Sequence, residues 1–357
     1  YMIPISKPYI GTEEKQAVME VLDSGMLVQG PRTAQLEEKF AGLCQTKYAV
    51  ATSSGTSALH IALLAHGIGK GDEVITSPFT FFATVSSILY TGATPVFVDI
   101  DEETFNLDPD KIEAAITPRT KAIMPVHLYG YPCDMTAIMK IAEKHGLVVI
   151  EDAAQAVGAS LNGKMTGSFG TGCFSLYATK NVMSIEGGII STDDEAIAKA
   201  CKLIRNHGME RRYYHDRLGY NLRMTDMHAA VGLAQFERIE RFNQKRTENA
   251  LILNSKINSV ITPTVRSGYH HVWHQYTIRI QHRDRDEAVK FINDNGVGTG
   301  IFYPVPAYAQ QPCLDAGIKQ PPLPITEKIV KEVISLPVHP QLTQEDLETI
   351  VSVVNKL

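Results

Sequence analysis

The sequence predicts an α/β protein with a mainly parallel central sheet and a smaller C-terminal α+β domain. Between residues 47 and 192, short apolar runs rich in β-branched residues alternate with helix-like stretches. This alternation is typical of parallel strands joined by helices that cover both faces of one sheet. The chain has 357 residues, which is long enough for one large domain with a substantial core and a second, smaller domain.

The predicted strands and helices follow one another in regular units. The first unit pairs a strand-like run at 48–54 with a helix-like stretch at 55–67. Further strand-like runs lie at 72–78, 94–101, 121–130 and 147–154, and the helix-like stretches between them lie at 79–92, 107–116 and 134–146. In such sheets, ligands bind at the carboxyl ends of the strands. The residues that directly follow each apolar run are therefore the candidates for chemistry.

The pattern changes after residue 192. We predict a helix over about 194–206, then a polar stretch rich in aromatic residues, then a long helical segment over about 225–257. The remainder alternates strand-like and helical segments and indicates a compact α+β unit. We place the boundary within the long helix, which gives a large domain at 1–245 and a small domain at 246–357.

Composition and charge exclude several classes of function. Thirty-four basic residues against 39 acidic residues give a net charge of −5, and the charges are scattered, so we expect no nucleic-acid partner. No apolar run reaches membrane-spanning length and no signal peptide is evident, so we expect no membrane partner. The five cysteines fit neither a disulfide framework nor a zinc motif. We therefore predict no metal site and a cytoplasmic location.

Two charged side chains follow predicted strands. Asp152 lies at the end of the apolar run within 147–154, where a carboxylate would suit a pyridinium nitrogen. At about 4 Å and an effective dielectric of about 20, that ion pair is worth roughly 4 kcal/mol. Its alternative role is a helix cap or a structural ion pair. Lys180 has small and apolar neighbours that would favour the neutral amine needed for Schiff-base chemistry. Its alternative is an ordinary solvated lysine.

Three small residues could hold a phosphate. Gly55 and Thr56 open a helix directly after a strand, where exposed N–H groups and the threonine hydroxyl can bind an anion. Ser175, at a strand end five residues before Lys180, could add a further hydroxyl. The alternative is an ordinary Ser/Thr helix cap. Phe81 could stack on a flat cofactor, although an aromatic residue in such a position is more often part of the core.

Taken together, these residues match the needs of one cofactor. Pyridoxal 5′-phosphate (PLP) needs a phosphate site, an aromatic stacking partner, a carboxylate for its ring nitrogen and a Schiff-base lysine. No other common cofactor needs the lysine. The sequence therefore predicts a PLP enzyme.

The sequence also resembles the DegT/DnrJ/EryC1/StrS family of sugar aminotransferases, which have the fold type I architecture of aspartate aminotransferase. The resemblance extends over almost the whole chain and includes the segments "GPRTAQLEEKFA", "TSSGTSALHIAL", "SPFTFFAT", "EDAAQAVGA", "GCFSLYATKN" and "GYNLRMTDMHAAVGLAQ". It implies a PLP-dependent fold type I transferase.

Position by position, the resemblance implies a role for each candidate residue. Lys180 would form the Schiff base and act as general acid and base, Asp152 would pair with the ring nitrogen, and Gln155 would hydrogen-bond the phenolic oxygen. Phe81 would stack on the ring. The remaining cofactor residues would hold the phosphate, and these are Gly55, Thr56, Ser175 and, from the neighbouring subunit, Asn221. The last assignment implies a homodimer with shared active sites.

The implied reaction moves an amino group from glutamate to a nucleotide-linked keto-sugar and releases 2-oxoglutarate. The stretch "RNHGMERRYYHDRLGYNLRMTD" is similar to the C4-aminating branch, which includes perosamine synthases, so we expect amination at C4 of a 4-keto-6-deoxyhexose. Amination at C3 is the alternative. Tyr308 stands where many relatives carry histidine and is a candidate contact for the sugar; alternatively it simply packs against the neighbouring subunit.

Three alternative functions would each need a sequence feature different from those present. A sugar dehydratase on the same scaffold would carry histidine in place of Lys180. A Rossmann oxidoreductase would need a glycine fingerprint after the first strand, which "ATSSGTSAL" lacks. A non-catalytic regulator would have no need for the set of Lys180, Asp152 and Gln155.

Overall fold

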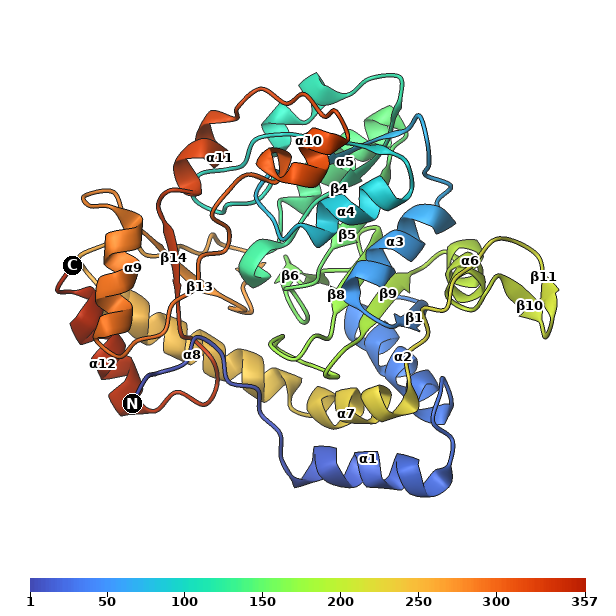
Figure 1. Cartoon of the computed structure of the whole chain (residues 1–357), viewed down its shortest axis with the longest axis horizontal. Helices are drawn as coiled ribbons and strands as arrows, with labels where there is room; N and C mark the ends of the chain where they lie inside the picture. Colours follow the sequence, from blue (N-terminus) through green and yellow to red (C-terminus); the bar gives the residue numbers. More distant parts are fainter.

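Seven strands form one central sheet in the order β1-β9-β8-β5-β4-β2-β3 (Figure 1). The computed structural model describes all 357 residues. Four of the strand pairs in this sheet are parallel, whereas β9 runs antiparallel to both β1 and β8. The predicted mainly parallel sheet is therefore confirmed. Its strands are β1 (Tyr48–Thr52), β2 (Glu73–Thr76), β3 (Thr94–Phe97), β4 (Thr120–Met124), β5 (Val148–Asp152), β8 (Thr171–Ser175) and β9 (Gly188–Thr192).

Helices cover both faces of this sheet. Because side chains alternate along a strand, neighbouring residues of β5 face opposite layers. Ile150 packs in the same cluster as Leu59 of α3, whereas Val149 packs with Ile138 of α5. One layer contains α3 (Gly55–Ala65), α4 (Ala83–Tyr90) and α6 (Glu195–Arg205); the other contains α2 (Pro31–Cys44), α5 (Met135–His145) and α7 (Asp226–Phe236).

Polar N-caps begin several of these helices. The carboxylate of Asp194 accepts hydrogen bonds from the first backbone N–H groups of α6, which begins at the predicted position. Thr225 caps α7 in the same way. The predicted single helix over 225–257 is wrong, because the chain forms α7 and then α8 (Ile239–Lys256). Arg238, at the break, pairs with Glu13 and Glu14 of α1 (Thr12–Ser24), which lies against α7.

A second hydrophobic core lies beside the sheet. It includes Leu253 of α8, Trp273 and residues of β13 (Tyr276–Arg279), α9 (Arg285–Asp294), β14 (Val333–Leu336) and α12 (Gln344–Val354). Ile3 packs in this core and pairs with Val297 in a parallel bridge. From there the chain runs along α8 to α1 (Figure 1). The boundary near residue 245 falls within α8 and stays a prediction.

The remaining elements are short. A hairpin of β10 (Met209–Arg211) and β11 (Tyr214–His215) projects from the body beside α6 (Figure 1). The others are β6 (Ser160–Leu161), β7 (Lys164–Met165), β12 (Tyr269–His270), α10 (Gln311–Asp315), α11 (Pro324–Ile329) and 3-10 turns at Pro109–Lys111, Glu113–Ala115, Leu128–Gly130 and Ala307–Ala309. No helix has both the length and the apolar character that crossing a membrane would require.

Candidate active site

A cavity of about 520 Å³ lies at the carboxyl ends of β5 and β8. Seven of the nine residues that the sequence singles out line this one cavity, and these are Gly55, Thr56, Phe81, Asp152, Gln155, Ser175 and Lys180. They come from positions up to 125 residues apart, from Gly55 to Lys180. Asn221 and Tyr308 do not line it.

One end of the cavity is suited to an anion. Ser54 caps α3 and accepts a hydrogen bond from the N–H of Ser57 at 3.0 Å. Gly55 is the first residue of the helix, and a Cβ added to it would lie 2.7 Å from the Cβ of Ser175. Glycine therefore lets α3 approach β8 closely. The helix N-terminus and the hydroxyls of Thr56 and Ser175 face one space, which favours a phosphate.

Asp152 is the last residue of β5 and is buried. Its Oδ2 accepts a hydrogen bond from the Thr84 hydroxyl at 2.6 Å, and its Oδ1 accepts one from the N–H of Ala154 at 3.2 Å. Burial raises the pKa of Asp152, and the hydrogen bond from Thr84 is the strongest influence in the opposite direction. A cation beside this carboxylate would further favour its charged form.

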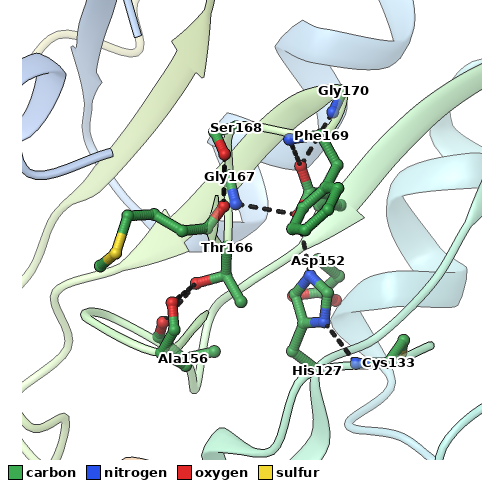
Figure 2. Close-up of polar contacts among 12 residues, drawn as sticks. His127, Cys133, Asp152, Ala156, Thr166, Gly167, Ser168, Phe169 and Gly170 are labelled. Atoms are coloured by element: carbon green, nitrogen blue, oxygen red, sulfur yellow. Dashed lines mark hydrogen bonds and ion pairs between the residues drawn. The ribbon is translucent and has the colours of Figure 1, made fainter. Parts of the chain in front are cut away.

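Glu151, the residue before Asp152, helps to hold the end of β5 in place. Glu151 is fully buried and accepts hydrogen bonds from the N–H groups of Gly167, Phe169 and Gly170 at 2.9–3.0 Å. His127 contacts the same carboxylate through Nε2 at 3.0 Å, while its Nδ1 accepts from the N–H of Cys133 (Figure 2). The backbone N–H of His127 also donates to the carbonyl of Asp152. His127 is thus a structural residue that fixes the end of β5.

Lys180 lies in the loop between β8 and β9. Burial lowers the pKa of its amine to about 8, and the charge of Asp152 opposes that shift. An amine with a pKa of about 8 carries a sizeable neutral fraction near neutral pH. The neutral form is the one that attacks carbonyl groups and accepts protons.

Gln155 has one amide hydrogen that is available to a ligand. Its Oε1 accepts a hydrogen bond from the N–H of Tyr129 at 2.6 Å, and its Nε2 donates to the Tyr303 hydroxyl at 3.1 Å. An amide nitrogen has two hydrogens, so one remains for a ligand. Burial raises the pKa of Tyr303, which therefore stays protonated and can donate into the cavity that it lines.

His274 brings a neutral acceptor to the cavity. The Nδ2 of Asn181 donates to the Asn243 side chain and to the carbonyl of Val272, both at 2.8 Å, so its Oδ1 faces Nδ1 of His274 at 3.3 Å. Nδ1 therefore carries the ring proton. Burial, together with the charges of Lys180 and Arg246, holds the pKa of His274 well below its usual range. Its Nε2 has no protein partner and can accept a hydrogen bond.

The two predicted residues outside the cavity have different surroundings. Tyr308 is buried; its hydroxyl donates to Glu327 at 2.6 Å and accepts from the N–H of Leu323 at 3.1 Å. The geometry favours Tyr303 over Tyr308 as the tyrosine that meets a substrate. Asn221 is exposed beyond the β10–β11 hairpin.

Sequence reasoning missed several residues that line the cavity. Thr84, His274 and Tyr303 belong to this group. So do Ile5 and Ser6 of the N-terminal segment. The helical stretch at 79–92 places Thr84 one turn after Thr80, which is the only signal that could have pointed to it.

The model of the DegT/DnrJ/EryC1/StrS aminotransferase family matches residues 8–355. The chain is 44% identical to the pleiotropic regulatory protein of Geobacillus stearothermophilus, over 98% of this chain and 96% of the relative. It is 42% identical to the UDP-N-acetyl-3-dehydro-α-D-glucosamine 3-aminotransferase of Acidithiobacillus ferrooxidans (94% and 91%). It is 40% identical to the GDP-perosamine synthase of Caulobacter vibrioides (99% and 98%).

A solved structure with the same fold is DesV of S. venezuelae in complex with a ketimine intermediate. It superimposes with a TM-score of 0.93 at 37% identity, and the match covers 96% of this chain and 94% of DesV.

Proposed function

Because the chain belongs to the DegT/DnrJ/EryC1/StrS aminotransferase family, we propose that it transfers the amino group of glutamate to a nucleotide-linked keto-sugar. The chain is a PLP-dependent sugar aminotransferase. We propose the amino donor, the acceptor and the role of each residue in the reaction. The observation that carries it is the position of Lys180 and Asp152 in one cavity with the anion site at α3.

The cavity fits the cofactor on structural grounds. A side chain at position 55 would clash with Ser175, so glycine lets the N-terminus of α3 and the Ser175 hydroxyl lie side by side at the phosphate end. The spare N–H of Gln155 suits a phenolic oxygen, and the buried carboxylate of Asp152 suits a ring N–H. We propose that Phe81, 59% exposed in this single chain, covers one face of the ring. Gly55, Thr56 and Ser175 would hold the phosphate.

Two side chains would carry the proton chemistry. When bound, the cofactor supplies an electron sink that stabilises negative charge beside the reacting amine. Asp152 would keep a proton on the ring nitrogen, since its carboxylate pairs with the N–H. Lys180 Nζ would take the proton from the α-carbon of glutamate and deliver a proton to the cofactor carbon, and in the second half of the reaction it would move a proton from the cofactor carbon to the sugar carbon. Its pKa of about 8 suits both tasks, because neutral and charged forms coexist near that pH.

We further propose that the sugar is aminated at C4. The support is the similarity of the stretch from Arg205 to Asp226 to C4-aminating enzymes. The choice between C3 and C4 depends on how the protein turns the hexose, and a misplacement of about 1 Å can cost on the order of 100-fold in rate. His274 and Tyr303 are placed to set that orientation, as acceptor and donor for sugar hydroxyls.

A substrate screen tests both the function and the position of amination. Nucleotide-linked 3-keto and 4-keto sugars are offered in matched pairs with glutamate, the product is detected by mass, and the new amine is located by NMR. We expect an aminated product from a 4-keto-6-deoxyhexose and formation of 2-oxoglutarate. A product aminated at C3 would reject the C4 proposal alone. No aminated product from any keto-sugar would reject the proposed function.

We also propose a homodimer in which Asn221 completes the phosphate site of its partner. Asn221 is exposed and lies outside the cavity of its own chain, and the nearby hairpin and the segment after it expose Tyr213 (74%) and Leu218 (82%). Exposed large apolar side chains near one another are typical of an interaction surface.

Mixing two inactive variants tests the shared site. Lys180→Ala and Asn221→Ala subunits are each expected to be inactive or severely impaired as homodimers. A hybrid would contain one site with both defects and one wild-type site, so random mixing should restore about one quarter of wild-type activity. Activity is measured after refolding the mixture, and hybrid formation is verified by two affinity tags. Proven hybrids without recovered activity, or a fully active monomer, would contradict the shared site.

A further inference from the structure

We propose that Thr84 is a positioning residue for Asp152, supported in turn by Thr80, and that these two hydroxyls fix the orientation and charge of the carboxylate. The proposal rests on the proposed function, because it requires Asp152 to face the ring nitrogen of the cofactor.

The hydrogen-bond geometry sets a direction. Thr84 Oγ1 lies 2.6 Å from Asp152 Oδ2 and 2.7 Å from Thr80 Oγ1. A charged carboxylate can only accept, so the single O–H of Thr84 points at Asp152. The oxygen of Thr84 then accepts from Thr80 at 2.7 Å, which is a shorter contact than the 3.3 Å from the Thr80 hydroxyl to the carbonyl of Phe81. Both O–H groups therefore point towards the carboxylate, and both threonines are buried.

Burial makes this support necessary. Asp152 is desolvated, which raises its pKa and favours the neutral acid. A neutral acid cannot hold a proton on a ring nitrogen through charge. Short O–H···O⁻ bonds such as that from Thr84 are roughly twice as strong as neutral hydrogen bonds. The other titratable groups around Asp152 are Lys180, whose charge favours the ionised form of Asp152, and His127, Glu151, Cys133, Cys173 and Tyr303.

The same short segment has a second contact with the cofactor site. Phe81 lies between the two threonines and is the proposed stacking side chain. One turn of chain at the start of α4 therefore places both the aromatic face and the support for the carboxylate. A displacement of this turn would disturb the two together.

The test compares Thr84→Val, Thr84→Ser and Ser87→Ala in the holoenzyme. Thr84→Val replaces the hydroxyl by a methyl group, and Thr84→Ser keeps the hydroxyl. Ser87→Ala removes a buried hydroxyl of α4 that donates to the Thr84 carbonyl and not to Asp152. The readout is the ¹⁵N NMR shift of cofactor labelled at its ring nitrogen, followed over pH. We expect the apparent pKa of the ring nitrogen to fall by about one unit in Thr84→Val, which is about tenfold in the protonation equilibrium.

Thr84→Ser and Ser87→Ala should keep the wild-type profile, and turnover should fall about tenfold in Thr84→Val only. A Thr84→Val profile equal to wild type would overturn the inference. So would a Thr84→Ser variant that behaves like Thr84→Val, or an equal shift in Ser87→Ala. If the ring nitrogen is unprotonated in the wild-type enzyme, or stays protonated in Asp152→Asn, the proposed role of Asp152 fails as well, and this result distinguishes the two failures.

Discussion

Replacing Lys180 with alanine is expected to lower turnover by at least about 10⁴-fold, because the variant loses the only amine in the cavity that can take the α-proton. The phosphate and ring contacts remain, so the variant should still bind the cofactor, but weakly. The rate of reaction with glutamate is measured under single-turnover conditions, and cofactor binding is measured by absorbance. Lys290→Ala is the matched control, since Lys290 is exposed on α9 and pairs only with Asp294.

Chemical trapping checks the same assignment. Borohydride reduction of the wild-type holoenzyme should fix the cofactor to Lys180, as peptide mapping would reveal. The pH dependence of cofactor capture follows from the lowered pKa of Lys180. Below about pH 8 the ammonium form dominates, so capture of cofactor by cofactor-free protein should slow about tenfold per pH unit and level off above pH 8. Label on another lysine, or a rate that still rises at pH 10, would contradict the role of Lys180.

Changing Asp152 to asparagine is expected to lower turnover by about 10³-fold. The charge pair with the ring nitrogen is worth roughly 4 kcal/mol at an effective dielectric of about 20, and each 1.36 kcal/mol corresponds to about tenfold in rate. Asparagine keeps the size of the side chain, and its amide oxygen can still accept from Thr84. The fold should therefore survive. The rates of both half-reactions are the measurement.

Asp284→Asn is the matched control for this charge removal. Asp284 caps α9 and does not line the cavity, and asparagine is an equally good N-cap. Its activity and thermal stability should match wild type. A turnover of Asp152→Asn within tenfold of wild type would mean that this carboxylate does not control the ring nitrogen.

The sequence predicted the part of the site that lies at strand ends. Asp152, Ser175 and Lys180 each follow an apolar run, and parallel strands deliver such residues to the same edge of the sheet. Thr84 and Tyr303 could not be found in this way. Thr84 is one threonine in a helix, and its importance depends on a contact with a strand 68 positions later. Tyr303 lies in a loop with no periodic signal.

The break between α7 and α8 was also hidden from sequence reasoning. The segment from Phe236 to Ile239 contains neither glycine nor proline, so local propensity favours a continuous helix. Arg238 leaves the helical pattern where it meets Glu13 and Glu14 of α1. Those partners lie more than two hundred residues earlier, and a pattern within one segment carries no information about them.

The bridge between Ile3 and Val297 has a consequence for the nascent chain. The N-terminal segment contributes Ile5 and Ser6 to the cavity wall, yet its anchor lies in a part of the chain that leaves the ribosome late. A chain that has emerged only as far as α8 already holds the phosphate cradle and Lys180 but lacks the backbone that pins this wall. Contacts of such long sequence separation form late in folding. The pocket is therefore complete only after Val297 has left the ribosome, and cofactor added before that point meets an unfinished binding site.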